Sequence, residues 1–151
     1  MQKLVLSIFF LTLIGCPYGL YRNSVEAIGF SVHKICSAEG KFAAANDGQF
    51  ASIPDLVQAG LLADKFKARE IYGYTFELAI KDKGFTLTAV PVDFGSANPS
   101  EPFTFYASDG GWITLKNSIE RDKFGKVTRT IAGPDDGPFL GNDKKPLLCE
   151  E

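Results

Sequence analysis

The sequence has few of the residues from which catalytic and metal sites are usually built. Among its 151 residues there is one histidine, His33, and there are three cysteines. Cys36 follows His33 by three positions, but a metal needs further ligands that the sequence does not place beside them. A serine or cysteine nucleophile would depend on the same histidine as its base. We therefore expect a protein that is not an enzyme, with no catalytic, cofactor-binding or metal-binding residues.

Long runs of basic residues are also lacking. The chain carries 16 lysines and arginines against 18 aspartates and glutamates, a net charge of −2 at pH 7, and its longest basic run is Lys144 and Lys145. Binding to a nucleic-acid backbone requires a concentrated positive patch. We therefore expect no nucleic-acid partner. The hydrophobic fraction of 45% is enough for the core of one domain.

The first 15 residues have the pattern of a signal peptide. Lys3 supplies a positive charge, and an apolar run follows from Leu4 to Ile14. The run ends in Leu13-Ile14-Gly15-Cys16, which resembles the lipobox of bacterial lipoproteins. This resemblance implies that Cys16 becomes the N-terminus and carries a thioether-linked lipid, with residues 16–22 as a tether. The alternatives are a membrane-spanning anchor and a secretory signal that is cleaved without lipid attachment.

The two remaining cysteines form a natural pair. If Cys16 is lipidated, Cys36 and Cys149 are left in an oxidising compartment, where disulfides persist. A bond between them would close a loop of more than 100 residues, which is worth on the order of 4 kcal/mol in the chain-entropy model. The alternative is two separate buried thiols. The export signal and the even pair predict a Cys36–Cys149 disulfide.

A long amphipathic helix is predicted to begin at Asn23, where Glu26 three residues later completes a variant capping box. Its end is predicted at Asn46-Asp47-Gly48, because asparagine and glycine accept the left-handed conformation. The apolar residues recur at helical spacing and predict one buried face. This face comprises Val25, Ile28, Val32, Ile35 and Phe42, whereas Ala27, Glu39 and Lys41 are expected nearer the solvent.

A second, short helix is predicted after Ser52, with Pro54 in its first turn and Asp55 completing a capping pattern. Its apolar side, which includes Leu56 and Val57, requires a packing partner. The helix is expected to close at Gly60, Leu61 and Leu62.

Alternating apolar residues then predict two hairpins. Residues 74–81 and 85–90 flank Asp82-Lys83-Gly84, and residues 103–107 and 112–115 flank a turn at residues 108–111. Val127–Ile131 is a candidate fifth, edge strand, and residues 116–151 are otherwise expected to be an irregular tail. One face of the sheet is expected to be the aromatic core and the Thr/Lys/Glu face to lie in water. The core aromatics are Tyr74, Phe76, Phe85, Phe103, Phe105 and Trp112.

These elements predict an α+β fold, with a long N-terminal helix and a short second helix on a four- to five-stranded antiparallel sheet in a single domain, 23–151. The segments 43–46, 52–62, 73–76 and 103–113 resemble the globular part of type IV pilins and type II secretion pseudopilins. The resemblance implies partners among envelope or secretion-system proteins. One departure matters: the chain lacks the Phe-Thr-Leu-Ile-Glu segment with which pilins begin their polymerising helix, so assembly into a filament is not expected.

The loop 133–143 contains oxygen ligands that a calcium ion could gather, and C-terminal loops of pseudopilins can hold calcium. These residues are Asp135, Asp136, Asn142 and Asp143. Their spacing is not that of an EF-hand, and aspartate with glycine and proline is the ordinary composition of a solvated turn. We assign no metal here.

Together these patterns predict a non-catalytic, exported and lipid-anchored pilin-like module of the bacterial cell envelope, with a structural or interaction role. It would face the periplasm or the cell surface and contact the membrane through its N-terminal lipid. Two alternatives remain. One is a periplasmic domain with a cystatin-like helix on a sheet, which binds a small ligand or a protein; the other is a minor pseudopilin that spans the membrane.

Overall fold

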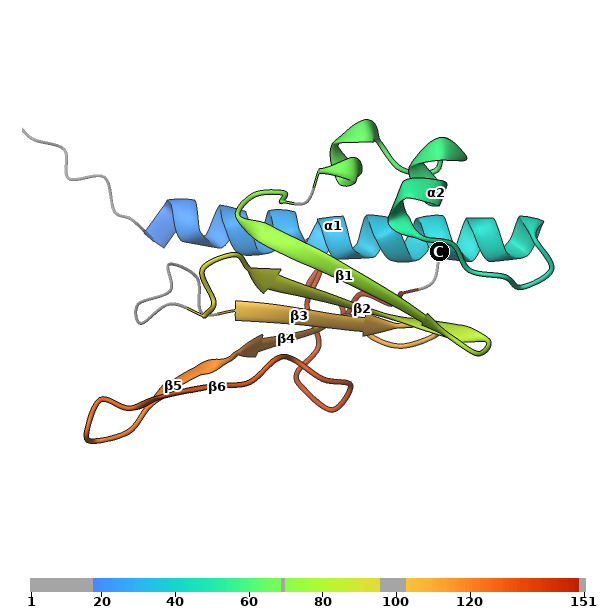
Figure 1. Ribbon diagram of the computed structural model, residues 1–151. Coiled ribbons are helices and arrows are strands. Elements are labelled where there is room, and N and C mark those ends of the chain that lie inside the picture. Colours follow the sequence, from blue (N-terminus) through green and yellow to red (C-terminus); the bar gives the residue numbers. More distant parts are fainter. Residues whose placement is uncertain (1–17, 69, 96–102, 150–151) are drawn as a thin grey trace, which may run out of the picture.

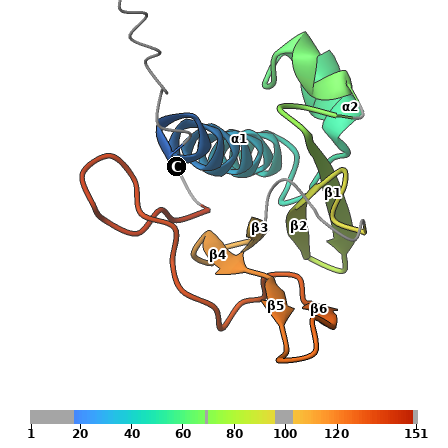
Figure 2. The same ribbon diagram turned by 90° about the vertical axis from the view of Figure 1, so that its left-hand side faces the viewer.

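A long helix lies across one face of an antiparallel sheet, and this arrangement confirms the α+β class (Figure 1). The structure, a computed structural model, describes residues 18–68, 70–95 and 103–149, with side chains from Val25 onward. Seen from the end of the helix, the sheet lies on one side of it and the short second helix beside it (Figure 2). None of the described helices is both long enough and apolar enough to span a bilayer.

The long helix begins earlier than the sequence predicts. Helix α1 spans Tyr18–Ala45, so the predicted start at Asn23 is wrong. A helix tolerates an asparagine in its interior, and no proline occurs between Tyr18 and Ala45 to interrupt it. The predicted tether over 16–22 is accordingly helical from Tyr18 onward. Cys16, the predicted lipid site, lies outside the described residues.

The buried face of α1 packs on the sheet, chiefly on its central strands. Ile28, Val32 and Ile35 on this face are fully buried. Glu39 is also fully buried, so its predicted position near the solvent is wrong. The reason is its spacing: positions 28, 32, 35 and 39 follow one helical stripe, and this register places Glu39 beneath the chain that follows the helix. The helix ends as predicted, with Asp47 and Gly48 at positive φ.

The second helix forms as predicted. Helix α2 spans Ile53–Gln58, with Ser52 as its N-cap accepting the N–H of Asp55. Gly60 adopts a φ of +74°, which lets the N–H groups of Leu61 and Leu62 both reach the carbonyl of Leu56. A single 3₁₀ turn follows, η1 (Asp64–Lys67), which the sequence analysis did not predict.

The four strands of the main sheet follow one another in space as they do in the chain, in the order β1-β2-β3-β4. All neighbours are antiparallel, and both predicted hairpins are confirmed. In register, Leu78 pairs with Leu87, and Leu87 with Ala107 on the next strand. The strands are β1 (Tyr74–Lys81), β2 (Gly84–Pro91), β3 (Phe103–Ser108) and β4 (Thr114–Asn117).

The predicted fifth strand is wrong in its placement. Strand β6 (Val127–Arg129) pairs with β5 (Ile119–Arg121) in a separate two-stranded sheet and does not extend the main one. The turn between them is closed by the Asp122 carboxylate, which accepts the N–H groups of Phe124 and Lys126 at 2.8 and 2.9 Å. The tail after residue 116 is therefore less irregular than predicted.

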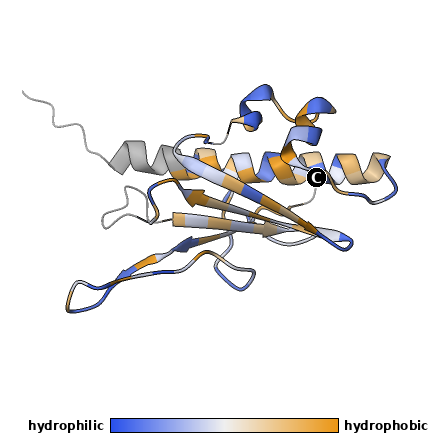
Figure 3. Cartoon of the chain, viewed as in Figure 1, coloured by the Kyte–Doolittle hydropathy of each residue, from blue (hydrophilic) through white to orange (hydrophobic). Residues whose placement is uncertain are grey.

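Polar residues gather at the tips of the β5–β6 hairpin and of the β1–β2 hairpin (Figure 3).

The aromatic face of the sheet is buried against α1, with Tyr74, Phe85 and Phe105 at most 4% exposed. Trp112, which was expected in the core, lies outside it and is 50% exposed. The next residue, Ile113, is fully buried just before β4 begins. Ile80, near the end of the edge strand β1, is also 46% exposed.

The opposite face of the sheet is covered at β3 and β4, whereas the sequence analysis expected it to lie in water. Thr104 and Thr114 are buried there under the segment that follows β6. The Thr104 hydroxyl accepts the N–H of Ala132 at 2.8 Å and lies 2.7 Å from the Ser118 hydroxyl. Thr114 donates its hydroxyl to the carbonyl of Gly133 at 2.8 Å. Threonine hydroxyls thus bind the returning backbone, which alternation alone does not reveal.

The C-terminal segment returns to α1 and is fastened there. Cys36 and Cys149 form a disulfide across 113 positions, with a Cα–Cα distance of 5.0 Å, which confirms the predicted pair. Phe139 donates its N–H to the carbonyl of Ile113 at 2.7 Å, and Ile113 donates to the carbonyl of Leu147 at 2.9 Å. The tail therefore lies along β4 and ends against the helix.

Candidate functional site

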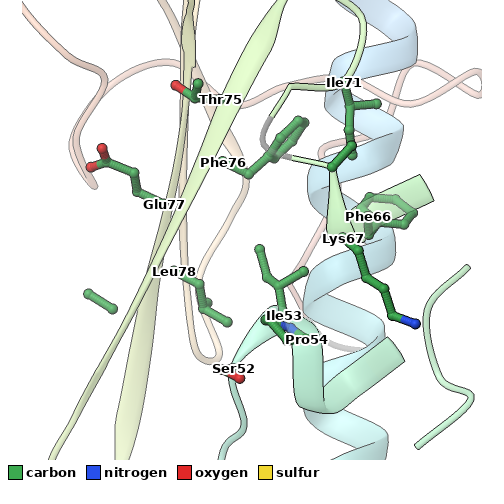
Figure 4. Close-up of a pocket in the computed structure, with 12 residues that line it drawn as sticks. Ser52, Ile53, Pro54, Phe66, Lys67, Ile71, Thr75, Phe76, Glu77 and Leu78 are labelled. Atoms are coloured by element: carbon green, nitrogen blue, oxygen red, sulfur yellow. The ribbon is translucent and has the colours of Figure 1, made fainter. Parts of the chain in front are cut away.

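A groove with a volume of about 700 Å³ lies between β1 and the α2–η1 segment. We call it the strand-edge groove. Phe76 and Leu78 project into it from β1 (Figure 4). Its opposite wall is formed by Ile53 of α2, Phe66 of η1 and Ile71.

The groove is open because β1 is an edge strand. The outer side of β1 is bridged to Ile71 at Tyr74, and no other described strand pairs with it. An edge strand leaves alternate backbone N–H and C=O groups without a ladder partner. α2 stands beside this edge because the Ser52 cap and Pro54 fix the direction in which the helix begins. The groove thus combines backbone hydrogen-bonding groups with apolar side chains.

A second hollow of about 350 Å³ lies between α1 and the segment 61–66. We call it the basic groove, because its charged lining residues are Lys34, Lys41 and Lys65, with His33 beside them. The sequence analysis assigned no role to these lysines, which are separated in the chain. Only the i, i+7 spacing of Lys34 and Lys41 on one helix could have indicated that they lie on the same side.

Glu39 is a buried carboxylate that the sequence analysis missed as an internal group. One carboxylate oxygen accepts the N–H of Ala51 at 3.0 Å, whereas Oε1 has no hydrogen-bond partner among the described residues. Burial raises the pKa of Glu39 from its ordinary value near 4.5 to about 7. The hydrogen bond from Ala51 opposes this rise, and the negative charge of Asp109 adds to it. The carboxyl therefore changes its charge near neutral pH.

The candidate site residues from the sequence are distributed as follows. Cys36 and Cys149 meet in the disulfide, which leaves no thiol at Cys36 to share a ligand with His33. His33 lies half-buried at the basic groove instead. Within the described ranges, no three His, Cys, Asp or Glu side chains are grouped so that they could hold a metal ion.

Two of the three aspartates of the loop 133–143 are engaged by the protein itself. Asp136 accepts the N–H of Gly133 at 2.7 Å and pairs with Lys116 at 3.3 Å. The hydrogen bond from Gly133, followed by Lys116, lowers the pKa of Asp136. Asp143 accepts the N–H of Lys145 at 3.1 Å. These contacts are those of turns that hold their own backbone.

What the two grooves offer chemically is contact surface, backbone hydrogen-bonding groups and positive charge. The hydroxyl of Ser52, at the rim of the strand-edge groove, already caps α2. In comparisons with known proteins, no family model, curated protein or solved structure matched the chain. The fold, the disulfide and the geometry of these grooves are therefore the observations that bear on the function of the protein.

Proposed function

We propose that the protein is a non-catalytic, exported module of the bacterial cell envelope, anchored to a membrane by a lipid on Cys16, with a pilin-like domain that binds a partner polypeptide. Three features support this proposal. The lipobox-like end of the apolar segment supplies the anchor, the Cys36–Cys149 disulfide suits an oxidising compartment, and the long helix on an antiparallel sheet suits the pilin-like resemblance.

The single observation that favours polypeptide binding is the strand-edge groove. An extended segment that pairs with β1 beyond the Ile71–Tyr74 bridge would satisfy the remaining backbone groups of that edge. Its alternate side chains would contact Ile53, Phe66 and Phe76. This mode of binding supplies affinity through main-chain hydrogen bonds and specificity through side-chain contacts. The partner we propose is therefore an extended segment of another envelope or secretion-system protein.

The cystatin-like alternative of the sequence analysis gains less support. It requires a concave aromatic pocket on the sheet, whereas Tyr74, Phe85 and Phe105 are packed beneath α1 and belong to one core cluster. A ligand for that face would have to displace the helix.

Lipid attachment is tested by metabolic labelling with radioactive palmitate in a bacterial host, with and without the signal-peptidase inhibitor globomycin. We expect label in the wild-type chain, accumulation of the precursor with globomycin, and no label in Cys16→Ser. A wild-type chain that is exported without label would refute the anchor.

Polypeptide binding is tested with extended peptides selected on the wild-type protein from a random library. Ile53→Arg places a charge in the groove and should weaken peptide binding at least about tenfold, because it disrupts the apolar wall. Gln58→Arg is the matched control on the exposed side of the same helix, with circular dichroism confirming the fold of both variants. Methylation of alternate peptide amides should also abolish binding. Peptides that tolerate both Ile53→Arg and amide methylation would refute strand addition.

A further inference from the structure

The basic groove, the hollow between α1 and the segment 61–66, concentrates positive charge in a protein that is negatively charged as a whole. The net charge of the chain is −2, yet all charged side chains that line this groove belong to lysines. Lys34 and Lys41 are seven residues apart on α1, which separates their Cα atoms by about 10 Å along the same side of the helix. Lys65 approaches from the opposite wall. The three lysines thus come from two elements and line one hollow.

The position of Lys65 is held by its neighbours. Its ammonium nitrogen lies 5.5 Å from the ring centre of Phe66 and 5.2 Å from that of Tyr72. It also donates to the Tyr72 hydroxyl at 3.3 Å, which uses one of its three N–H groups. These contacts restrict the conformations of the Lys65 side chain in the unliganded protein. Less conformational entropy is therefore lost when a ligand binds.

The walls of the groove increase the attraction for an anion. Leu62 and Phe66 are at most 8% exposed and form an apolar surface beneath the lysines. Charges beside such a low-dielectric wall interact more strongly than charges in open water. Two acidic residues, Asp64 and Glu39, are sequence neighbours of lining residues, and neither of them lines the groove. Asp64 accepts from Lys67 at 2.9 Å, and Glu39 accepts the N–H of Ala51.

We propose that the basic groove binds a phosphate group, carried either by a small soluble phosphate ester or by the headgroup of an anionic lipid. Three lysines from two elements, with His33 on the same lining, suit a tetrahedral anion that accepts hydrogen bonds in several directions. Lysine binds phosphate as a point charge and does not require the planar geometry of a carboxylate. A hollow of about 350 Å³ holds a phosphate with a small substituent such as glycerol.

Calorimetric titration of the full chain in a non-ionic, phosphate-free detergent tests this proposal. The ligands are inorganic phosphate, glycerol phosphate and a short-chain phosphatidylglycerol. Short-chain phosphatidylcholine, which is zwitterionic and has no net charge, is the comparison. Lys34→Glu combined with Lys41→Glu should weaken binding at least about tenfold, since two charge-assisted contacts are reversed. Lys81→Glu combined with Lys83→Glu, at the exposed β1–β2 turn, changes the net charge equally and should leave binding within about twofold.

The results distinguish a soluble phosphate ester from a lipid headgroup, or they refute the phosphate site. Equal binding of glycerol phosphate and short-chain phosphatidylglycerol would assign a soluble ester. Binding of short-chain phosphatidylglycerol alone would assign a lipid headgroup. Absence of binding to all three phosphate ligands, or an equal loss of binding in the two double variants, would overturn the proposal.

Discussion

The ring of Phe139 occupies the place where a side chain on Gly29 would begin. A β-carbon built on Gly29 would lie 2.3 Å from two ring carbons of Phe139. The same ring packs edge-on against Phe30 and Phe105, with ring centres 6.1 and 5.7 Å apart. The tail therefore approaches α1 so closely at position 29 that only glycine fits there without a shift of the Phe139 ring.

Gly29→Ala should consequently destabilise the protein. The ring of Phe139 is confined between two other rings, so the added methyl group costs roughly 1–3 kcal/mol of overpacking. This cost exceeds the gain in helix propensity, which is about 1 kcal/mol. Gly40→Ala is the matched control, because nothing lies within 4 Å of its β-carbon, and it should stabilise the protein. Urea unfolding of both variants measures the difference in the free energy of unfolding. If Gly29→Ala stabilised the protein as much as Gly40→Ala, the Phe139 ring would have to move aside at no cost.

Glu39 should make stability fall as the pH rises from about 4.5 to about 7. Its pKa in the folded protein, about 7, lies above its ordinary value near 4.5, so the folded state binds the proton more tightly than the unfolded chain. The stabilisation is complete below pH 4.5 and is lost as the pH rises through 7. The free energy of unfolding should be about 3 kcal/mol lower well above pH 7 than below pH 4.5 as a result of this one group. Glu39→Gln should reduce this pH dependence and should be more stable than wild type at pH 8.

The control for Glu39 is Glu77→Gln, which changes an exposed carboxylate on β1. It should preserve the pH dependence of the wild-type protein. Urea unfolding at several pH values between 4 and 8 makes the comparison. If Glu39→Gln retained the wild-type slope between pH 4.5 and 7, the titrating group would have to be another residue.

The disulfide should contribute much of the stability of the domain. Cys36 and Cys149 enclose most of the chain, and the chain-entropy model gives roughly 4 to 5 kcal/mol for a loop of this length. Cys36→Ser combined with Cys149→Ser should lower the free energy of unfolding by an amount of this order. The mass of the alkylated, non-reduced exported protein measures the bond itself. Two free thiols at these positions would contradict it.

The hydroxyl of Thr104 should contribute more to the stability of the folded protein than the hydroxyl of an exposed threonine does. Thr104→Val leaves the N–H of Ala132 buried without its acceptor, at a cost of roughly 1–3 kcal/mol. Thr86→Val on β2 is the control, because Thr86 is exposed and valine suits a strand. Thermal unfolding of the two variants should separate them clearly. Equal melting temperatures would mean that another group replaces the hydroxyl.

Helical and strand periodicity allowed much of the fold to be predicted. Ser52 and Asp55 identified the second helix, and the alternation from Tyr74 onward identified the first hairpin, because both are local signals that the structure retains. The disulfide followed from counting cysteines in an exported chain. Each of these predictions depended on neighbouring residues or on simple pairing.

The failures have a common cause in distant packing. Polarity suggested that Glu39 faces solvent, but its register on α1 and the following chain bury it. The tail carries no periodic pattern, and its position depends on contacts such as Phe139 with Gly29 and Thr104 with Ala132. The basic groove was missed for the same reason, because Lys65 joins the helix lysines only after α2 and η1 fold back.

The Cys36–Cys149 bond also determines how the molecule would transmit a pulling force. Every strand, together with α2 and η1, lies within the covalent ring that this bond closes. Tension between the start of α1 and residue 149 would pass along about the first two thirds of the helix, as far as Cys36, and through the sulfur atoms. The sheet and the strand-edge groove would remain outside the path of the force, whereas Lys34 of the basic groove lies on the loaded part of the helix. A protein held by its N-terminal end could thus be pulled from its C-terminal end without losing the surface proposed to bind a polypeptide.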